Sequence, residues 1–526
     1  MPSRFVLVPA DNPFNRGEVP TAKVLMARMA LRRHAAKAAT AVVPPGGGAM
    51  ASMASVATAH GLSAAALKNA ESNGPRLPSV RVVKRLPEDN GSILLELDEE
   101  DRLALQREYP GARVVPEGEA CMAFMSLVLQ ELATMTTTSR KPPIKLLVRV
   151  RDAKKRVLAH TDVQCIFDSK TSPPTGATSK TDGKGMATLL VPTQFRKVDI
   201  VVNPQHSVWP AERESIVVGK RSTIVDIVCP RIVDANDCAR ALYKEVKSTA
   251  GENVSVAVID GGAGPHASLN IAGGANLADD ARPKDFSDNG IGHGTHVAGL
   301  IAAQSTNGWR GGFAPGVTLR MYRVYKDNDT RCGSFVIAEA IRKAVDDGAD
   351  LINLSLTLSN DQPEITRELR RARAMGVSII AAAGNAGGAV LFPARLSGVL
   401  AVSAMGIVGC APAGSNVDLA CLPKPLGKDH NHRIADFSCF GPEIDLIGPG
   451  VGIVSLFPKE KRAIMSGTSM AAPVVTGRIA NALSAHPEIL QQPRGQARSD
   501  AINRLAMHSV RNLGFFAKYQ GQGLPE

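Results

Sequence analysis

The sequence predicts an α/β fold for the C-terminal half of the chain, preceded by two smaller domains of different architecture. Three observations predict this division of the 526 residues. After residue 235, near-continuous apolar strands alternate with helices, which is typical of a parallel sheet with helices on both faces. Residues 1–118 follow a β-α-β-β-α-β order, the ferredoxin-like α+β plan. Residues 143–231 contain short strands at regular spacing, which indicates a small β-sandwich.

The first domain, residues 1–118, contains two structured parts separated by a low-complexity insertion at 41–75, which is rich in Ala, Gly, Ser and Pro. We expect strands at 4–10, 80–86, 92–97 and 112–116, and helices at 20–40 and 98–109. The basic helix at 20–40 fits two interpretations: a domain helix with a solvated basic face, or a membrane-surface or targeting helix.

Residues 119–142 are interpreted as a linker to the β-sandwich at 143–231. The sequence TDGK at 181–184 is a hairpin-type turn within this sandwich. We expect its strands at 144–150, 161–167, 185–191, 198–203 and 222–228. A sandwich brings no chemistry by itself, so packing, spacing or partner binding are its expected uses.

The third domain, residues 235–526, has the alternating pattern of the α/β class. Strands are expected at 254–259, 318–325, 351–356, 377–383, 399–404 and 444–447. Helices are expected at 295–303, 334–347, 364–375 and 467–485.

Composition narrows the function classes. Aromatic residues make up only 4% of the chain, which disfavours a lectin or a surface that stacks single-stranded nucleic acid. No apolar stretch suits a spanning helix, so no membrane partner is expected. The net charge is +12, of which residues 119–234 carry +6, and this segment is where an acidic protein partner would bind. No motif supports a nucleic-acid partner, which is therefore disfavoured.

The eight cysteines form no C-x-x-C pair, so no metal site is predicted. In a chain of this size they are interpreted as mostly buried thiols of a reducing compartment. The first 30 residues lack the pattern of a secretory signal, so we expect a cytoplasmic protein, with secretion by another route left open.

Four polar residues stand where strands end or helices begin in the third domain. Asp260 ends a strand in VAVIDGG, and His293 opens a helix in GHGTHVAG. Ser469 opens another helix in SGTSMAAP, and Asn385 follows a strand in AAAGN. Such positions gather at the carboxyl edge of a parallel sheet. An acid, an imidazole and a hydroxyl together are the parts of a nucleophilic triad.

The third domain resembles the subtilisin-like serine protease (subtilase) family. The resemblance rests on VAVIDGG, HGTHVAGLIAA, AAAGNAG and GTSMAAPVVTG in this order, and covers about residues 235–510. It implies a subtilisin-like fold and a serine endopeptidase that acts on polypeptide substrates through an acyl-enzyme. Ser469 would be the nucleophile, His293 the base, Asp260 its orienting acid and Asn385 an oxyanion-hole donor. His296, in the same block as His293, is expected to be structural.

The resemblance also implies how a substrate binds. An extended peptide would pair with two segments beside the triad, Ser355-Leu356-Thr357 and Cys332-Gly333-Ser334. Ala382, Ala383 and Gly384 would form the floor of the pocket for the residue before the cut. The family usually has glycine where Thr357 stands. The substrate-binding residues are therefore expected to be Gly333, Ser334, Ser355, Leu356, Thr357, Ala383 and Gly384.

The first domain resembles the family's propeptide, chiefly through residues 92–119, and would then act as an intramolecular inhibitor that keeps the enzyme latent as a zymogen. The cut that releases it is expected after about residue 118. No cofactor is needed for the chemistry, and structural calcium is compatible with the family, Asp327-Asn328-Asp329 being a weak candidate. The alternative of another class is a catalytically idle subtilase scaffold that serves as a binding module.

Overall fold

The computed structural model divides the chain into two compact units, residues 1–118 with 362–364, and residues 119–361 with 365–526. The structure describes residues 3–8, 81–87, 91–108, 113–123, 142–168, 175–204, 206–219, 223–233, 237–243, 246–279, 281–306, 309–412, 415, 417–422 and 431–526. The helix predicted at 20–40 and the insertion predicted at 41–75 lie outside the described residues.

The first unit contains a four-stranded sheet in the order β2-β3-β1-β4. Its elements are β1 (Ser3–Val8), β2 (Arg81–Arg85), β3 (Ile93–Leu97), α4 (Glu99–Glu108) and β4 (Arg113–Pro116). Strand β1 pairs antiparallel with both β3 and β4. The apolar core cluster of this unit takes alternate residues of β1 and β3, including Phe5, Leu7 and Leu95, as expected for one face of a sheet. Val6 and Leu94, on the other face of the same strands, are buried as well.

The β-sandwich belongs to the second unit, together with the α/β domain. One sheet has the order β11-β10-β7-β8 and the other β12-β6-β9. The strands are β6 (Ile144–Asp152), β7 (Asp162–Asp168), β8 (Thr175–Lys180), β9 (Met186–Val191), β10 (Lys197–Asn203), β11 (Ala211–Val217) and β12 (Thr223–Cys229). Inward residues of both sheets form a single apolar core, as Val148 and Ile200 illustrate.

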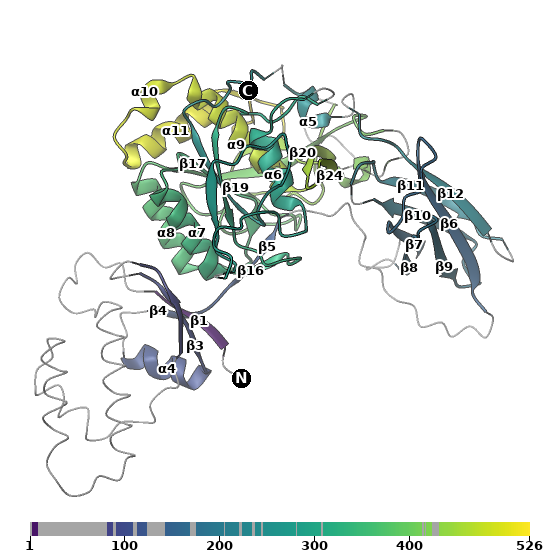
Figure 1. Ribbon diagram of the computed structural model, residues 1–526, viewed down its shortest axis with the longest axis horizontal. Coiled ribbons are helices and arrows are strands. Elements are labelled where there is room, and N and C mark those ends of the chain that lie inside the picture. Colours follow the sequence, from purple (N-terminus) through teal and green to yellow (C-terminus); the bar gives the residue numbers. More distant parts are fainter. Residues whose placement is uncertain are drawn as a thin grey trace, which may run out of the picture. The chain divides into compact units, whose positions relative to one another are not determined.

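An eight-stranded sheet forms the centre of the α/β domain (Figure 1). Its order is β14-β15-β13-β17-β19-β20-β21, with β22 also paired to β20. The strands are β13 (Ser255–Asp260), β14 (Gly273–Asn276), β15 (Thr318–Arg323), β17 (Leu351–Leu354), β19 (Ser378–Ala382), β20 (Leu400–Ile407), β21 (His432–Ile434) and β22 (Ile444–Pro449). Along β13, Val256 and Val258 belong to one core and Ala257 and Ile259 to another, so both faces of the sheet are buried.

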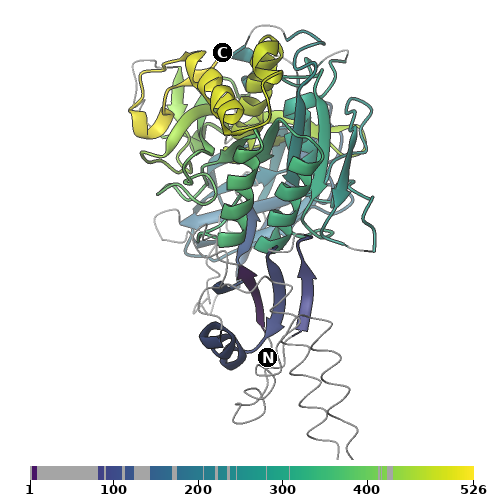
Figure 2. The same cartoon turned by 90° about the vertical axis from the view of Figure 1, so that its left-hand side faces the viewer.

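Helices cover both faces of this sheet. Helices α6 (His293–Ala302) and α9 (Thr468–Ser484) contribute to one core. Helices α7 (Ser334–Asp346) and α8 (Pro363–Ala374) contribute to the other core and run side by side in Figure 2. The remaining elements are α5 (Cys238–Ala241), η2 (Val417–Ala420), β23 (Ile453–Phe457), β24 (Lys461–Met465), α10 (Pro487–Leu490), α11 (Gln496–His508), β25 (Val510–Arg511), α12 (Ala517–Gln520) and β26 (Leu524–Pro525). Within the described residues, no helix combines the length and apolarity that crossing a bilayer requires.

Three differences from the sequence predictions concern the central sheet, the predicted linker and the cysteines. The sheet is mixed rather than wholly parallel, because β21 pairs antiparallel with β20. A short antiparallel strand at the edge is a common feature of otherwise parallel sheets. The segment predicted as a linker begins with a strand, β5 (Glu119–Met122), which lies between β16 (Arg331–Gly333) and β18 (Leu356–Thr357).

The third difference concerns the cysteines. Cys238 and Cys410 form a disulfide across a sequence separation of 172 residues, with their Cα atoms 5.6 Å apart. The prediction that the cysteines are mostly buried thiols is therefore wrong for this pair. Sequence spacing does not show such a pairing, because only the fold brings the two ends together. Cys165, Cys229 and Cys439 are buried thiols, but Cys121 is exposed and Cys332 and Cys421 are only partly buried, so the expectation of mostly buried thiols is wrong for the set as a whole.

Candidate active site

Asp260 is the last residue of β13, a strand held between β15 and β17. Its side chain is buried, and its Oδ1 atom accepts a hydrogen bond of 2.6 Å from the backbone N–H of Gly261. The same oxygen accepts a hydrogen bond of 2.8 Å from Nδ1 of His293. The carboxylate thus fixes which ring nitrogen of His293 carries the proton and how the ring is turned.

His293 is the first residue of α6 and is fully buried. Gly292, before it, has a φ of 82°, a left-handed conformation that favours glycine. Gly294, after it, allows the helix to approach β13 closely, because a Cβ there would lie 2.1 Å from the carbonyl oxygen of Gly262. Two glycines therefore set the position of the ring against Asp260.

Ser469 is the second residue of α9, the helix that packs against α6. Its Oγ donates a hydrogen bond of 2.9 Å to the carbonyl oxygen of Ser355. Its backbone N–H donates a hydrogen bond of 3.1 Å to the carbonyl oxygen of Ala123. The start of a helix places N–H groups and the positive end of the helix dipole around this carbonyl.

Asn385 follows β19 and faces the start of α9. Its Oδ1 accepts hydrogen bonds from the backbone N–H of Thr468 at 2.9 Å and from the Thr468 hydroxyl at 2.8 Å. These two bonds hold the amide with its NH2 group turned away from Thr468. The Nδ2 atom is buried and has no acceptor among the described residues. A fixed donor without an acceptor, next to Ser469, is suited to an oxygen that becomes negative during a reaction.

Strand β5 fills the groove between β16 and β18. Met122 lies opposite Leu356, Cys121 lies opposite Thr357, and Glu119 lies opposite Gly333. The next residue, Ala123, continues the ladder, because its N–H donates a hydrogen bond of 3.2 Å to the carbonyl of Ser355. Residues 119–123 therefore bind as an extended peptide that adds a strand between β16 and β18 and reaches Ser469 at Ala123.

The predicted substrate-binding residues separate into three groups in the structure. Gly333, Leu356 and Thr357 pair with β5, and Ser355 bonds to Ala123. Gly384 lies beside the start of α9, where its N–H donates to the Thr468 hydroxyl at 3.1 Å, and Ala383 is buried with its N–H bonded to the Val402 carbonyl at 2.9 Å. Ser334 is buried as the first residue of α7, outside the ladder.

Two contributors were missed by the sequence prediction. Thr330 accepts a hydrogen bond of 3.2 Å from the N–H of Met122, and Arg331 lies opposite Cys121. The predicted linker also contains a contributor, residues 119–123. Its sequence carries no strand signal, because EACM is four residues long and does not alternate between polar and apolar residues, although exposed and buried positions alternate in the structure.

His296, one turn further along α6, has a structural place, as expected. It is fully buried, and its Nε2 donates a hydrogen bond of 3.0 Å to the carbonyl of Ile453. Burial, followed by the proximity of His293, lowers the pKa of His296 to about 3. The side chain is therefore neutral at physiological pH and adds no second charge beside His293.

Within the described residues, no group of three or more metal-ligating side chains comes together. The weak calcium candidate at 327–329 does not form a ligand cluster. The two carboxylate oxygens of Asp327 pair with Arg282 and Arg323, and the carboxylate of Asp329 accepts the N–H of Arg331. These residues do not fit a calcium ion, whose ligands are six to eight oxygens.

Comparison with known proteins agrees with this geometry. The sequence model of the Subtilase family matches residues 251–524. The chain is 32% identical over 281 residues to subtilisin DY of Bacillus licheniformis, which covers 52% of this chain and 89% of that protein. It is 33% identical over 256 residues to the major intracellular serine protease of Bacillus subtilis, covering 47% of this chain and 73% of that protein. It is 35% identical over 239 residues to a thermostable alkaline protease of Halalkalibacterium halodurans, covering 45% of this chain and 58% of that protein.

Proposed function

We propose that Asp260, His293 and Ser469 carry out the chemistry of this chain, which belongs to the subtilase family and is a subtilisin-like serine endopeptidase. We also propose that residues 119–123 of the same chain keep the enzyme latent. The observation that carries the proposal is the hydrogen bond of 3.1 Å from the Ser469 N–H to the Ala123 carbonyl. In the proposal, this carbonyl takes the part of the scissile carbonyl of a substrate.

In the proposed reaction, Oγ of Ser469 attacks the substrate carbonyl while His293 takes its proton. The hydrogen bond of 2.8 Å from His293 Nδ1 to Asp260 directs the other ring nitrogen to this task and stabilises the imidazolium. His293 then protonates the leaving amine, and water hydrolyses the ester on Ser469. The hydroxyl turns from the Ser355 carbonyl, to which it now donates, toward His293.

The negative oxygen of the tetrahedral intermediate would receive two hydrogen bonds. One comes from the backbone N–H of Ser469, which already donates to Ala123. The other comes from Nδ2 of Asn385, whose orientation is fixed by Thr468. Donors held in place before the reaction stabilise the transition state without the cost of reorganisation.

The proposed latency follows from what fills the groove. As long as residues 119–123 pair with β16 and β18, no other peptide can add a strand there. The proposed cut falls after Ala123, five residues beyond the cut expected from sequence. A cut there would release a first fragment of 123 residues and leave the β-sandwich attached to the protease domain, because the sandwich follows that position in the chain.

Mass spectrometry of the purified protein tests this proposal. The wild-type chain should yield fragments that end at Ala123 and begin at Phe124, and Ser469→Ala should stay intact. Ser359→Ala, which changes an exposed serine, is the matched control and should be cut like wild type. A wild-type cut at another position would contradict the proposed register of residues 119–123.

A fluorophosphonate label separates the enzyme from the idle-scaffold alternative. This reagent reacts with an activated serine, so the processed wild-type protein should be labelled and should hydrolyse peptides, while Ser469→Ala should do neither. Absence of both label and hydrolysis in wild-type protein whose 119–123 segment has been displaced would leave the binding module as the remaining function.

A further inference from the structure

A loop of the β-sandwich, residues 206–209, is built into the protease domain. Trp209 is fully buried and belongs to the apolar core that also contains residues of α6 and α9. Its ring lies over Gly452, where a Cβ would come within 3.3 Å of it. A buried tryptophan removes a large apolar area from water and fixes the loop that carries it. The sandwich is therefore packed against the protease domain through Trp209 and is not only connected to it by the chain.

The same loop contacts the hairpin formed by β23 and β24. The N–H of Ser207 donates a hydrogen bond of 2.8 Å to the carbonyl of Arg462. The Nε2 atom of His206 accepts one of 2.7 Å from the Lys461 ammonium. The imidazole of His206 also stacks on Phe457, with ring centroids 5.4 Å apart and planes inclined by 11°.

The hairpin in turn holds the helix that begins with His293. Phe457 packs against Gly292, because a Cβ on that glycine would lie 2.1 Å from the ring. The carbonyl of Ile453 accepts the hydrogen bond of His296, and the Ser455 hydroxyl donates one of 2.7 Å to the carbonyl of His296. Three contacts thus connect the hairpin to the first turn of α6.

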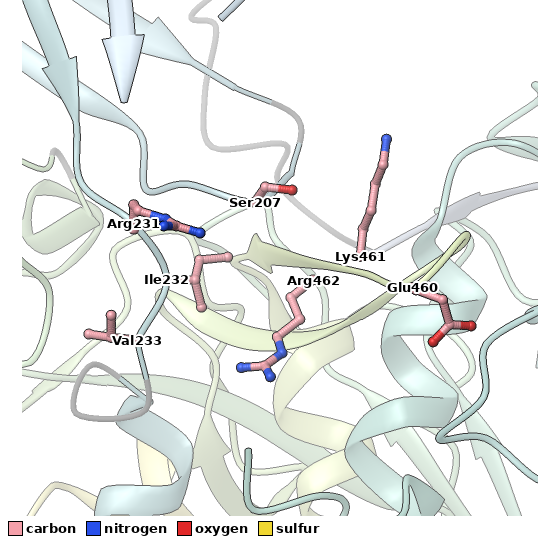
Figure 3. Close-up of a pocket in the computed structure, with 7 residues that line it drawn as sticks. All are labelled: Ser207, Arg231, Ile232, Val233, Glu460, Lys461 and Arg462. Atoms are coloured by element: carbon pink, nitrogen blue, oxygen red, sulfur yellow. The ribbon is translucent and has the colours of Figure 1, made fainter. Parts of the chain in front are cut away.

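Beside this joint the packing is incomplete. A cavity of about 500 Å³ separates residues 231–233 from the turn and strand at 460–462 (Figure 3). Ser207, Arg231, Ile232, Val233, Glu460, Lys461 and Arg462 line it. Ile232, which lines this space, also packs against the apolar core of the protease domain, so residues 231–233 support the joint together with the 206–209 loop.

We propose that the β-sandwich positions the catalytic histidine, through the path from His206 to Phe457 to Gly292. His206 is then a positioning residue for His293, although it belongs to another domain and touches neither substrate nor triad. This inference rests on the proposed function, in which His293 is the general base. A small displacement of a catalytic group lowers turnover strongly, so the path matters for rate more than for substrate binding.

The test compares His206→Ala with His206→Phe. Each variant is expressed as the full chain and measured after self-cleavage. Alanine removes the stack on Phe457 and should lower kcat about tenfold, with KM within about twofold of wild type. It should also move the acidic limb of the pH profile of kcat/KM, which reports the base of the free enzyme. Phenylalanine keeps a ring on Phe457 and should restore both values. Ile224→Ala, at a 61% exposed position on the sandwich strand β12, is the matched control and should behave as wild type.

Rates are expressed per molecule labelled by a fluorophosphonate, so that unfolded protein does not count. If His206→Ala folds poorly, Phe457→Leu interrupts the same path and should give the same loss. Unchanged kcat and pH profile in both variants would overturn the inference. A wild-type protein that takes no label would instead contradict the proposed function, so the two failures are distinguishable.

Discussion

At the scale of single residues, Asn385 is placed to donate a hydrogen bond to the oxyanion. Both bonds of its Oδ1 go to Thr468, and its buried Nδ2 lacks an acceptor among the described residues. We expect Asn385→Ala to lower kcat about 100–1,000-fold with little change in KM, because the lost bond forms in the transition state. Steady-state kinetics on a peptide substrate measures this. An equal rise in KM would show that the amide binds the ground state instead.

The residue before the cut should be small. Ala123 is only 4% exposed and belongs to the apolar core of the protease domain. We expect peptides with Ala before the cut to be hydrolysed faster than those with Phe or Lys, because a larger side chain would have to displace the residues packed around this position. A peptide library that varies this position measures the preference, and equal rates for Ala and Phe would contradict it.

His296 makes stability depend on pH. Its pKa is about 3 in the folded chain and about 6.5 when unfolded, so the unfolded state binds more protons below pH 6.5. Stability is therefore complete above pH 6.5 and falls as the pH drops toward 3, by about 2 kcal/mol at pH 5. Urea unfolding of Ser469→Ala at pH 7.5 and 5, with and without His296→Gln, measures this. The glutamine variant, which does not titrate, should lose less stability on acidification.

The motif residues could be identified from sequence because each is surrounded by glycines and small residues that mark a strand end or a helix start. Asp260 and His293 are 33 residues apart in sequence and 2.8 Å apart in space. Sequence did not show the role of Trp209 or His206. Their partners, Gly452 and Phe457, are about 250 residues away, and no local pattern links them.

At the scale of elements, α6 depends on a close approach to β13. We expect Gly294→Ala to lower stability by about 1–3 kcal/mol, because a methyl group would collide with the Gly262 carbonyl and push the helix outward. Turnover should fall as well, since His293 moves from Asp260. Gly183→Ala is the control: nothing lies within 4 Å of its Cβ position, so its stability should change by less than about 0.5 kcal/mol.

Elements with a strong apolar pattern were predicted from sequence, and weakly patterned ones were not. Strand β10 was expected at 198–203 and spans Lys197–Asn203. Strands β8 and β11 were missed, because TGATSK contains a glycine and AERESIV has three charged residues in succession. Their backbone hydrogen bonds to β7 and β10 make them strands. Strand β5 likewise depends on the edges of β16 and β18, which are distant in sequence.

At the scale of the whole molecule, the disulfide closes a loop that contains most of the active site. Cys238 lies in α5, directly after the sandwich, and Cys410 follows β20, so Asp260, His293 and Asn385 lie between them and Ser469 lies outside. We expect Cys238→Ala with Cys410→Ala to lower stability by about 2–5 kcal/mol, because the unfolded chain regains the freedom of a long loop. Thermal unfolding in the Ser469→Ala background measures the loss. Dithiothreitol should lower the Tm of the parent protein and leave that of the double variant unchanged. Equal sensitivity of both proteins to the reductant would contradict a stabilising disulfide.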